Sequence, residues 1–293
     1  MKFTQLPPPD ILKNVVRYFW TLENSDDSVI TGNRNQDSNS GSPAVTVPNT
    51  NRVFRITADG CPGIVFQHSD QGRFHKDNNK LPEIFLYGQS TRYAELSLEG
   101  KFNTIGLSFY PDALKLLFEL NAEELTDTCM DLDPIAAQQG FRLTGQLSAT
   151  GPLEDQIQFL SGYLYSRLRA GEDNRITDSP MQYALSRILH SKGSLSLKAL
   201  QDTLQVTERS FERKFKQWVG ISPKLFSRIC RFQASLAQLR DNDYSKLSDI
   251  AYDNDYADQS HLIRSFKEFA GISPFQFQKQ YNELVENFSE RRP

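Results

Sequence analysis

Two stretches of the chain repeat each other at an offset of 51 residues. They are Glu208–Phe226 and Gln259–Phe277. The positions that carry the same residue in both are Arg213 and Arg264, Phe215 and Phe266, Lys216 and Lys267, residues 220–223 and 271–274 (Gly-Ile-Ser-Pro), and Phe226 and Phe277. A repeat of this kind predicts one local structure that is built twice.

Each copy has the pattern of an amphipathic helix that ends at a glycine. At about 100° per residue, the apolar side chains of each copy fall on one face and the polar ones on the other. The apolar faces consist of Phe211, Phe215 and Trp218, and of Leu262, Phe266 and Phe269. Gly220 and Gly271 suit the left-handed end of a helix, and the Ser-Pro pairs that follow suit the N-cap and first turn of the next one.

A shorter helix and a tight turn precede each copy. The predicted short helices are Ser196–Leu204 and Leu247–Asn254, and the turns are 205–207 and 255–258. This order is that of a helix-turn-helix, whose second helix enters the major groove of DNA. A predicted helix over Lys224–Arg240, about 25 Å long, joins the two units. The sequence therefore predicts a module that contacts two major-groove segments about 34 Å apart.

The outward faces of the repeated helices supply the candidate DNA-binding residues. They are Arg209, Glu212, Arg213 and Lys216 in the first helix, and Gln259, Ser260, Ile263, Arg264 and Lys267 in the second. Arginine can bind guanine, glutamine adenine, glutamate cytosine and isoleucine the thymine methyl group. The alternatives are phosphate contacts for the arginines and an ion pair between Glu212 and Lys216, four residues apart. Lys216, Lys267 and Lys224 are expected to meet phosphates.

Residues 190–285 resemble the DNA-binding domain of the AraC/XylS family of bacterial transcription regulators. The motifs that carry the resemblance are residues 210–216 (SFERKFK), 220–223 (GISP), 231–234 (RFQA), 249–251 (DIA), 256–267 (YADQSHLIRSFK) and 271–274 (GISP). The resemblance implies that double-stranded DNA is a partner and that the protein is an activator acting on RNA polymerase. Gln205 and Asp255 stand where the family has glycine, and Gln201 stands where it has a small residue, so the first motif is expected to pack differently or to be less stable.

Short β-branched and aromatic runs precede this region, separated by Pro, Gly, Asn and Asp. The runs are 16–22, 44–47, 53–56, 64–67, 84–87, 93–98 and 104–109, followed by a predicted helix over 111–120. They predict an antiparallel sandwich or barrel. Residues 57–62, 87–91 and 105–113 more weakly resemble a β-barrel, cupin-like sensory domain of some family members, which implies a place where an unknown small-molecule or protein effector is sensed.

The predicted fold class is thus α+β, with an antiparallel β-rich domain followed by an all-α domain with two helix-turn-helix motifs. The predicted boundaries are 1–150 for a regulatory domain, 151–179 for a helix and linker, and 180–293 for the DNA-binding domain. Residues 23–42 are polar and are expected to form a mobile loop, and 171–179 a linker. Leu153–Arg169 carries a leucine-rich stripe, either for packing onto the β-rich domain or for a homodimer seam.

Charge and residue types narrow the functional classes. Residues 180–293 carry a net charge of +4 and residues 1–179 one of −7, so the C-terminal part suits a polyanion. The three cysteines are few and far apart, the four histidines have no metal-ligand spacing, and no catalytic set or phosphate-binding glycine loop is evident. We therefore expect no metal, no cofactor and no enzymatic activity.

The N-terminus lacks an apolar leader segment and the chain lacks a long apolar run, which predicts a cytoplasmic protein without membrane contact. Two alternatives to a sensory domain remain for residues 1–150. One is a metal-dependent or other enzyme that carries a DNA-targeting tail, and the other is a scaffold that binds a protein partner.

Overall fold

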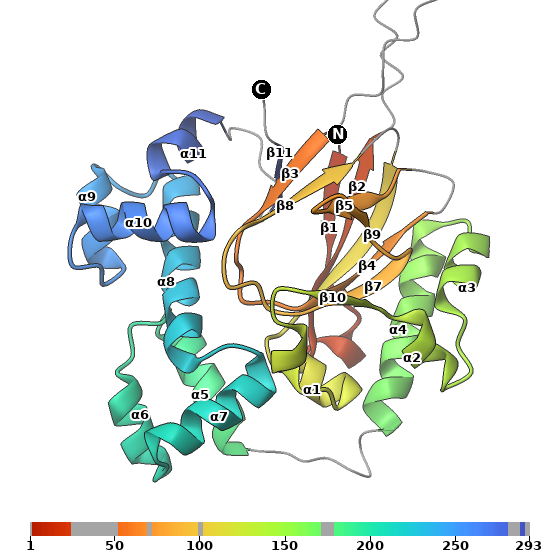
Figure 1. Ribbon diagram of the computed structural model, residues 1–293, viewed down its shortest axis with the longest axis horizontal. Helices are drawn as coiled ribbons and strands as arrows, with labels where there is room; N and C mark the ends of the chain where they lie inside the picture. Colours follow the sequence, from red (N-terminus) through yellow and green to blue (C-terminus); the bar gives the residue numbers. More distant parts are fainter. Residues whose placement is uncertain are drawn as a thin grey trace, which may run out of the picture.

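The computed structural model describes residues 2–24, 52–68, 72–98, 102–170, 179–280 and 288–290. Figure 1 shows a β-rich part and a helical part lying side by side, with the long helix α8 (Pro223–Arg240) running along the helical part. The predicted fold class is confirmed at this level, while the cupin-like detail and the domain boundaries stay predictions.

Two antiparallel sheets make up the β-rich part. The first has the order β1-β2-β9-β4-β7-β10 and the second β11-β3-β8-β5-β6. The strands are β1 (Lys2–Leu6), β2 (Val16–Asn24), β3 (Arg52–Ile56), β4 (Gly63–Gln67), β5 (Phe74–Lys76), β6 (Asn79–Lys80), β7 (Ile84–Tyr87), β8 (Ala94–Leu98), β9 (Phe102–Phe109), β10 (Cys129–Asp131) and β11 (Phe288–Glu290). Strands β1, β5, β6, β10 and β11 were not expected from the sequence.

Side-chain alternation along the strands sends residues into two cores. In β4, Ile64 and Phe66 join a cluster on the helix-covered face of the first sheet, whereas Val65 joins a cluster between the sheets. The rings of Phe54 in β3 and Phe102 in β9 meet between the sheets, with centroids 5.9 Å apart. Strand β4 is buried along its whole length because both of its faces are covered.

Helices cover the outer face of the first sheet (Figure 1). They are η1 (Asp10–Leu12), α1 (Ala113–Phe118), η2 (Ala122–Leu125), α2 (Asp133–Ala137), α3 (Leu143–Ala149) and α4 (Leu153–Ala170), where η marks a 3₁₀ helix. The stripe of α4 packs into this chain's own core: Leu160 and Leu164 are buried there, and Leu153, Ile157 and Leu168 pack around them. Of the two alternatives for the leucine-rich stripe, the structure thus has packing onto the β-rich part. A dimer through α4 would have to use the faces of the helix that lie outside the stripe.

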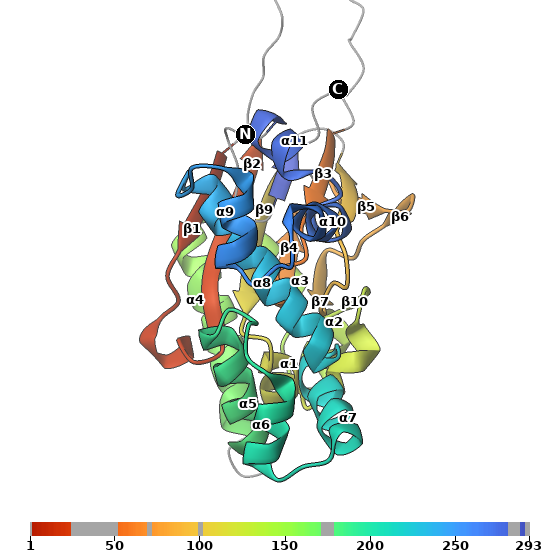
Figure 2. The ribbon, with the colours of Figure 1, turned by 90° about the vertical axis from the view of Figure 1, so that its left-hand side faces the viewer.

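The helical part contains both copies of the repeat. Its helices are α5 (Ser179–His190), α6 (Leu197–Leu204), α7 (Glu208–Val219), α8, α9 (Leu247–Asp253), α10 (Gln259–Phe269) and α11 (Pro274–Gln280). Figures 1 and 2 place α6 and α7 near one end of α8, and α9 and α10 near the other. At 18 residues, α8 is about 27 Å long.

Several sequence predictions fall on residues outside the described ranges. They concern most of the loop 23–42, the strand 44–47 and the linker 171–178. The loop prediction is wrong at its start, because Glu23 and Asn24 extend β2 and pair with Asn103 and Phe102 of β9. Backbone pairing with a central strand holds these two polar residues in the sheet.

Candidate nucleic-acid interface

The second helix of each helix-turn-helix motif, α7 and α10, is called a reading helix here. Both reading helices are built as the repeat predicts. The Thr207 side chain accepts a hydrogen bond from the Ser210 N–H (3.3 Å) at the start of α7, and Asp258 accepts one from His261 (2.7 Å) at the start of α10. The predicted apolar faces are buried in one core, and Gly220 ends α7 at φ 98°. Ser222 caps α8 by accepting from the Leu225 N–H at 3.2 Å.

Both helix-turn-helix turns contain a left-handed residue that is not glycine. Gln205 has a φ of 54° and Asp255 one of 58°. Gln201 is buried, with 9% of its surface exposed, within the helix that precedes the first turn. The first motif therefore forms the same kind of turn as the second, although a side chain at Gln205 costs conformational free energy that glycine would not.

Replacing Gln205 by glycine is expected to raise the free energy of unfolding by about 0.5–1 kcal/mol, because glycine occupies the left-handed region without a Cβ clash. The measurement is urea unfolding followed by circular dichroism. Gln205→Ala is the matched control, since it removes the exposed side chain and keeps the Cβ. Equal stabilisation by both substitutions would contradict the prediction.

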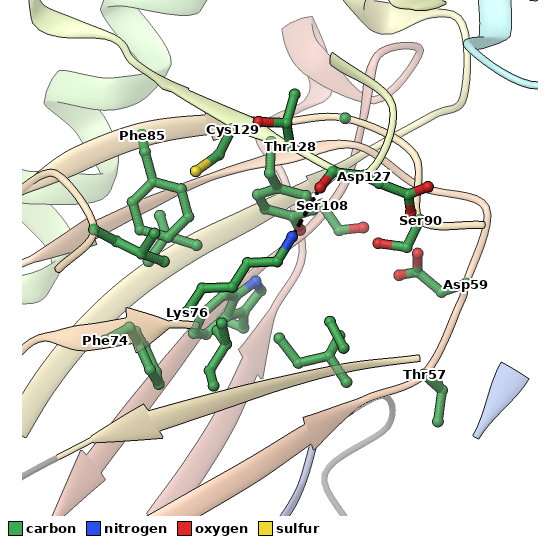
Figure 3. A pocket seen from close by; sticks show the side chains of 18 of the residues that line it. Thr57, Asp59, Phe74, Lys76, Phe85, Ser90, Ser108, Asp127, Thr128 and Cys129 are labelled. Atoms are coloured by element: carbon green, nitrogen blue, oxygen red, sulfur yellow. Dashed lines mark hydrogen bonds between the residues drawn. The ribbon is translucent and has the colours of Figure 1, made fainter. Parts of the chain in front are cut away.

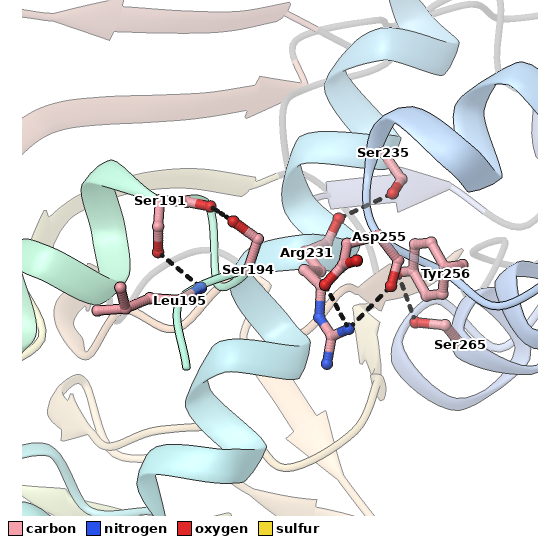
Figure 4. Close-up of polar contacts among 8 residues, drawn as sticks. All are labelled: Ser191, Ser194, Leu195, Arg231, Ser235, Asp255, Tyr256 and Ser265. Carbon is pink, nitrogen blue, oxygen red and sulfur yellow. Dashed lines mark hydrogen bonds and ion pairs between the residues drawn. The ribbon is translucent and has the colours of Figure 1, made fainter. Parts of the chain in front are cut away.

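An arginine that the sequence reading did not single out holds the second motif together (Figure 4). Arg231 of α8 donates to the carbonyl oxygen of Asp255 at 3.1 Å, and its Nη1 lies 3.8 Å from the Asp255 carboxylate. Its guanidinium also lies over the Tyr256 ring, 6.0 Å from the centroid. Tyr256 in turn shares a 3.1 Å hydrogen bond with Ser265 of α10. The network fixes the left-handed turn relative to α8 and α10. The one feature of the sequence that pointed to Arg231 was the motif at residues 231–234.

A similar polar arrangement lies where α5 gives way to α6, also drawn in Figure 4. Ser194 donates its hydroxyl to the carbonyl oxygen of Ser191 at 2.7 Å, and the Leu195 N–H donates to the Ser191 hydroxyl at 3.3 Å. These bonds satisfy backbone groups at a helix end, so they define the path from α5 into the first motif.

The predicted DNA-facing residues lie on exposed surfaces of α7 and α10. Arg209 and Arg213 are exposed on α7, whereas Glu212 and Lys216 are half-buried and form an ion pair of 3.2 Å. This pair is the structural alternative that the sequence left open for Glu212. On α10 the exposed members are Gln259, Ser260, Arg264 and Lys267, and Ile263 is half-buried. Lys224 is exposed in the first turn of α8.

The β-rich part touches the helical part close to both reading helices. The Ala58 N–H donates to the carbonyl oxygen of Phe269 (3.0 Å), and the Ala58 carbonyl oxygen accepts from the Gln233 side chain (2.7 Å). The Tyr93 N–H donates to Glu268 (3.3 Å), and the Thr126 hydroxyl donates to Gly220 (2.7 Å). Ala58 is fully buried within the core cluster of the helical part. No pattern in the sequence indicated these contacts.

A cavity of about 100 Å³ lies within the β-rich part (Figure 3). Its wall is largely apolar and aromatic, with contributions from both sheets, including Trp20, Phe74, Phe85 and Leu96. The polar groups that line it include Thr57, Asp59, Lys76, Ser90, Ser108, Asp127 and Thr128. The Lys76 ammonium donates to the carbonyl oxygen of Asp127 at 2.8 Å. An apolar enclosure with a few polar groups is typical of small-molecule sites.

The polar loops around this cavity are also tied to one another. The Asp127 carboxylate accepts hydrogen bonds from the Thr91 N–H (2.8 Å) and the Thr91 hydroxyl (2.6 Å). The backbone N–H of Asp127 donates to the Gln89 carbonyl oxygen (2.8 Å). The Gln89 side chain donates to the carbonyl oxygen of Gly60 (2.9 Å). The segments around residues 60, 90 and 127 therefore form one hydrogen-bonded unit.

Cys61 is buried beside this unit, and burial opposes formation of the nucleophilic thiolate. The Arg17 Nη1 donates to the Cys61 sulfur at 2.9 Å. The backbone N–H of Cys61 donates to the Asp59 carboxylate at 3.0 Å. Burial nevertheless raises the pKa of the Cys61 thiol to about 12, so the thiol is protonated at neutral pH. All three cysteines lie in the described ranges and are free thiols.

Two properties of the described residues bear on metal binding and on membrane contact. No group of three or more histidine, cysteine, aspartate or glutamate side chains within these ranges is arranged to hold a metal ion. In the same part of the chain, no helix is both long enough and apolar enough to cross a membrane.

Each part of the chain matches a known family model. Residues 200–280 match the family described as a helix-turn-helix domain. The chain carries an AraC-type helix-turn-helix domain. Residues 4–131 match a family described as a domain of unknown function, DUF6597. The predicted resemblance is thus confirmed for the helix-turn-helix domain.

The individual proteins that this chain resembles share less than 30% of their residues with it. An uncharacterised HTH-type transcriptional regulator of Haemophilus influenzae is 28% identical over 105 residues, which are 36% of this chain and 35% of that protein. The match thus spans about a third of the relative. ToxT of Vibrio cholerae O395 is 12% identical over 81% of this chain and 95% of its own, with a TM-score of 0.41. Fatty acid-bound ToxT of strain SCE256 is 14% identical over 81% and 94%, with a TM-score of 0.43. Neither ToxT structure is similar enough to indicate a shared ligand.

Proposed function

We propose that this protein is a sequence-specific transcription regulator that binds two adjacent major-groove segments of double-stranded DNA, one with α7 and one with α10. The observation that carries the proposal is the presence of two capped, amphipathic reading helices near opposite ends of α8. Each buries its aromatic face and exposes a basic, polar one. Helices of this kind read base edges and phosphates.

The two reading faces differ, so the two half-sites should differ as well. In α7 the exposed arginines are Arg209 and Arg213, which suit guanine. In α10, Arg264 has Gln259 and Ser260 as its exposed neighbours, and Ile263 is available to a thymine methyl group. Lys216, Lys224 and Lys267 would add phosphate contacts that carry affinity without sequence information.

The signal that controls DNA binding is proposed to enter the cavity of the β-rich part. Support comes from the loops that line the cavity, because they are continuous with the residues that contact the helical part. Thr57 and Asp59 line the cavity and flank Ala58, which is bonded to Phe269. Asp127 lines the cavity and follows Thr126, which is bonded to Gly220. A small, mainly apolar molecule with a polar group fits this lining better than a protein partner does.

The resemblance to the AraC/XylS family extends the proposal to activation of transcription through RNA polymerase in the cytoplasm. A homodimer through residues 153–169 is part of the same hypothesis, with the restriction that the leucine stripe of α4 is already packed within the chain. An enzymatic role for the β-rich part is the rival. Metal analysis of the purified protein tests the metal-dependent form of that rival, since a stoichiometric transition metal would favour it.

Selection from random double-stranded DNA with the full-length protein tests the central proposal. We expect an enriched sequence with two different half-sites whose centres lie about one helical turn apart, since α7 and α10 belong to one chain. The enriched site should bind at least about 1000-fold more tightly than unrelated DNA at physiological salt. Recovery of no enriched sequence would refute sequence-specific binding.

A further inference from the structure

The β-rich part contacts the two reading helices in different ways. η2 packs against α7, and Thr126, directly after η2, donates its hydroxyl to the carbonyl oxygen of Gly220 at 2.7 Å. A Cβ at Gly220 would lie 3.0 Å from the Ala122 carbonyl oxygen and 3.1 Å from the Thr126 hydroxyl. At α10, the Tyr93 and Ala58 N–H groups donate to the backbone oxygens of Glu268 and Phe269 in the last turn, and a Cβ at Gly271 would lie 2.9 Å from the Tyr93 ring. The close contact with η2 is therefore a feature of the first reading helix.

An acidic side chain of η2 stands next to the DNA-facing surface of α7. Glu123 shares one surface hollow, of about 760 Å³, with the reading face of that helix. The other residues of the hollow are Thr207, Glu208, Arg209, Glu212, Arg213 and Lys216. The arginines and the lysine of this hollow are the proposed partners of DNA.

Two physical consequences follow for DNA that approaches α7. The major groove is about 12 Å wide and admits one helix, so a second element beside the reading face opposes full insertion. The carboxylate of Glu123, which is exposed, also repels the phosphates that flank the groove. On α10 the side chains of Gln259, Ser260, Arg264 and Lys267 are exposed to solvent. Arg209 and Arg213 of α7 are exposed to solvent as well, so the difference between the two helices lies in Glu123 and η2, which stand beside α7.

We infer that η2 restrains the first helix-turn-helix: in this conformation the protein engages DNA through α10, and α7 gains full access only when Glu123 and Thr126 move away from it. The inference rests on the proposed function. It also places the restraint beside the proposed signal site, because Asp127 lines the cavity and directly follows Thr126. An occupant of the cavity would act on the residue adjacent to the restraint.

The test compares Glu123→Gln with Glu124→Gln. The two residues are neighbours in η2, both are exposed, and each substitution removes one negative charge. Glu124 does not belong to the hollow beside α7. Binding is measured with the full-length variants on the site obtained by selection, and on versions of that site in which one half is scrambled. The half bound by α7 is the one whose scrambling removes the effect of Arg213→Ala.

We expect Glu123→Gln to bind the complete site about three- to tenfold more tightly than Glu124→Gln. The two variants should bind equally to DNA that keeps only the half bound by α10. Thr126→Val, which removes the hydrogen bond to Gly220, should tighten binding to the complete site in the same direction.

Equal affinities of the two glutamine variants for the complete site would overturn the inference. So would equal tightening by Glu123→Gln on both half-sites, because that result would reflect the net charge alone. Failure of the proposed function is distinguishable from both outcomes, since the unsubstituted protein would then show no preference for any selected sequence.

Discussion

Phe232→Ala is expected to lower the free energy of unfolding of the helical part by about 3–5 kcal/mol. Phe232 lies in α8, its side chain is fully buried, and its ring centroid lies 5.2 Å from that of Phe266 and 5.4 Å from that of Phe269. Truncation would leave a cavity between α8 and α10 and remove two aromatic contacts. Urea unfolding followed by circular dichroism measures the loss.

Phe275→Ala provides the matched control for this substitution. Phe275 is 70% exposed on α11, so the same chemical change should alter the free energy of unfolding by less than about 0.5 kcal/mol. Similar unfolding midpoints for the two variants would show that α8 and α10 are not joined through this aromatic core.

Arg264→Ala is expected to weaken binding to the selected DNA site by about 1–3 kcal/mol, which is a loss of roughly 5- to 150-fold. Arg264 is exposed on the reading face of α10, the helix that we propose to be accessible in this conformation. If it binds a guanine, the loss should be confined to DNA that carries that base, and DNA with the base replaced should bind both proteins alike. Titrations on the two DNAs give the four affinities required.

Lys267→Ala is the companion variant for a phosphate contact. It should weaken binding similarly on all sequences and reduce the slope of log affinity against log salt by about 1. A uniform loss for Arg264→Ala, with the same change in salt slope, would assign Arg264 to a phosphate and contradict base reading.

The helical part was predictable from the sequence because its determinants are local. The aromatic residues of α7 and α10 recur at helical spacing, and the caps Thr207 and Ser222 stand directly before the helices that they start. The left-handed turn at Gln205 was harder to predict, because its residue type does not favour that conformation. Its geometry comes from the packing of the two flanking helices.

The β-rich part was predicted in outline only. Long strands such as β9 show clear apolar and β-branched runs, whereas β5, β6 and β10 have two or three residues each, too few to show a period. β11 pairs with β3, more than 200 residues away in the chain, and nothing within its own three residues indicates that partner. Pairing of this kind depends on the assembled sheet.

The sequence predicts which faces of α7 and α10 are exposed, but it does not predict which parts of the β-rich part pack beside these helices. The exposed residues of α7 and α10 follow from periodicity, as does the ion pair between Glu212 and Lys216. The contact from Thr126 to Gly220 joins residues 94 positions apart, and Glu123 belongs to a short 3₁₀ helix without a distinctive pattern. Such contacts arise only when the two parts of the chain come together.

Ala58 connects the two parts of the chain. It belongs by sequence to the β-rich part, yet its side chain is fully buried and is a member of the core cluster of the helical part. A helical part expressed alone would lack this residue and expose apolar surface to water. Exchange of the β-rich part for another during evolution would therefore have to preserve the short loop around Ala58, which makes that loop a structural condition for domain shuffling in proteins of this architecture.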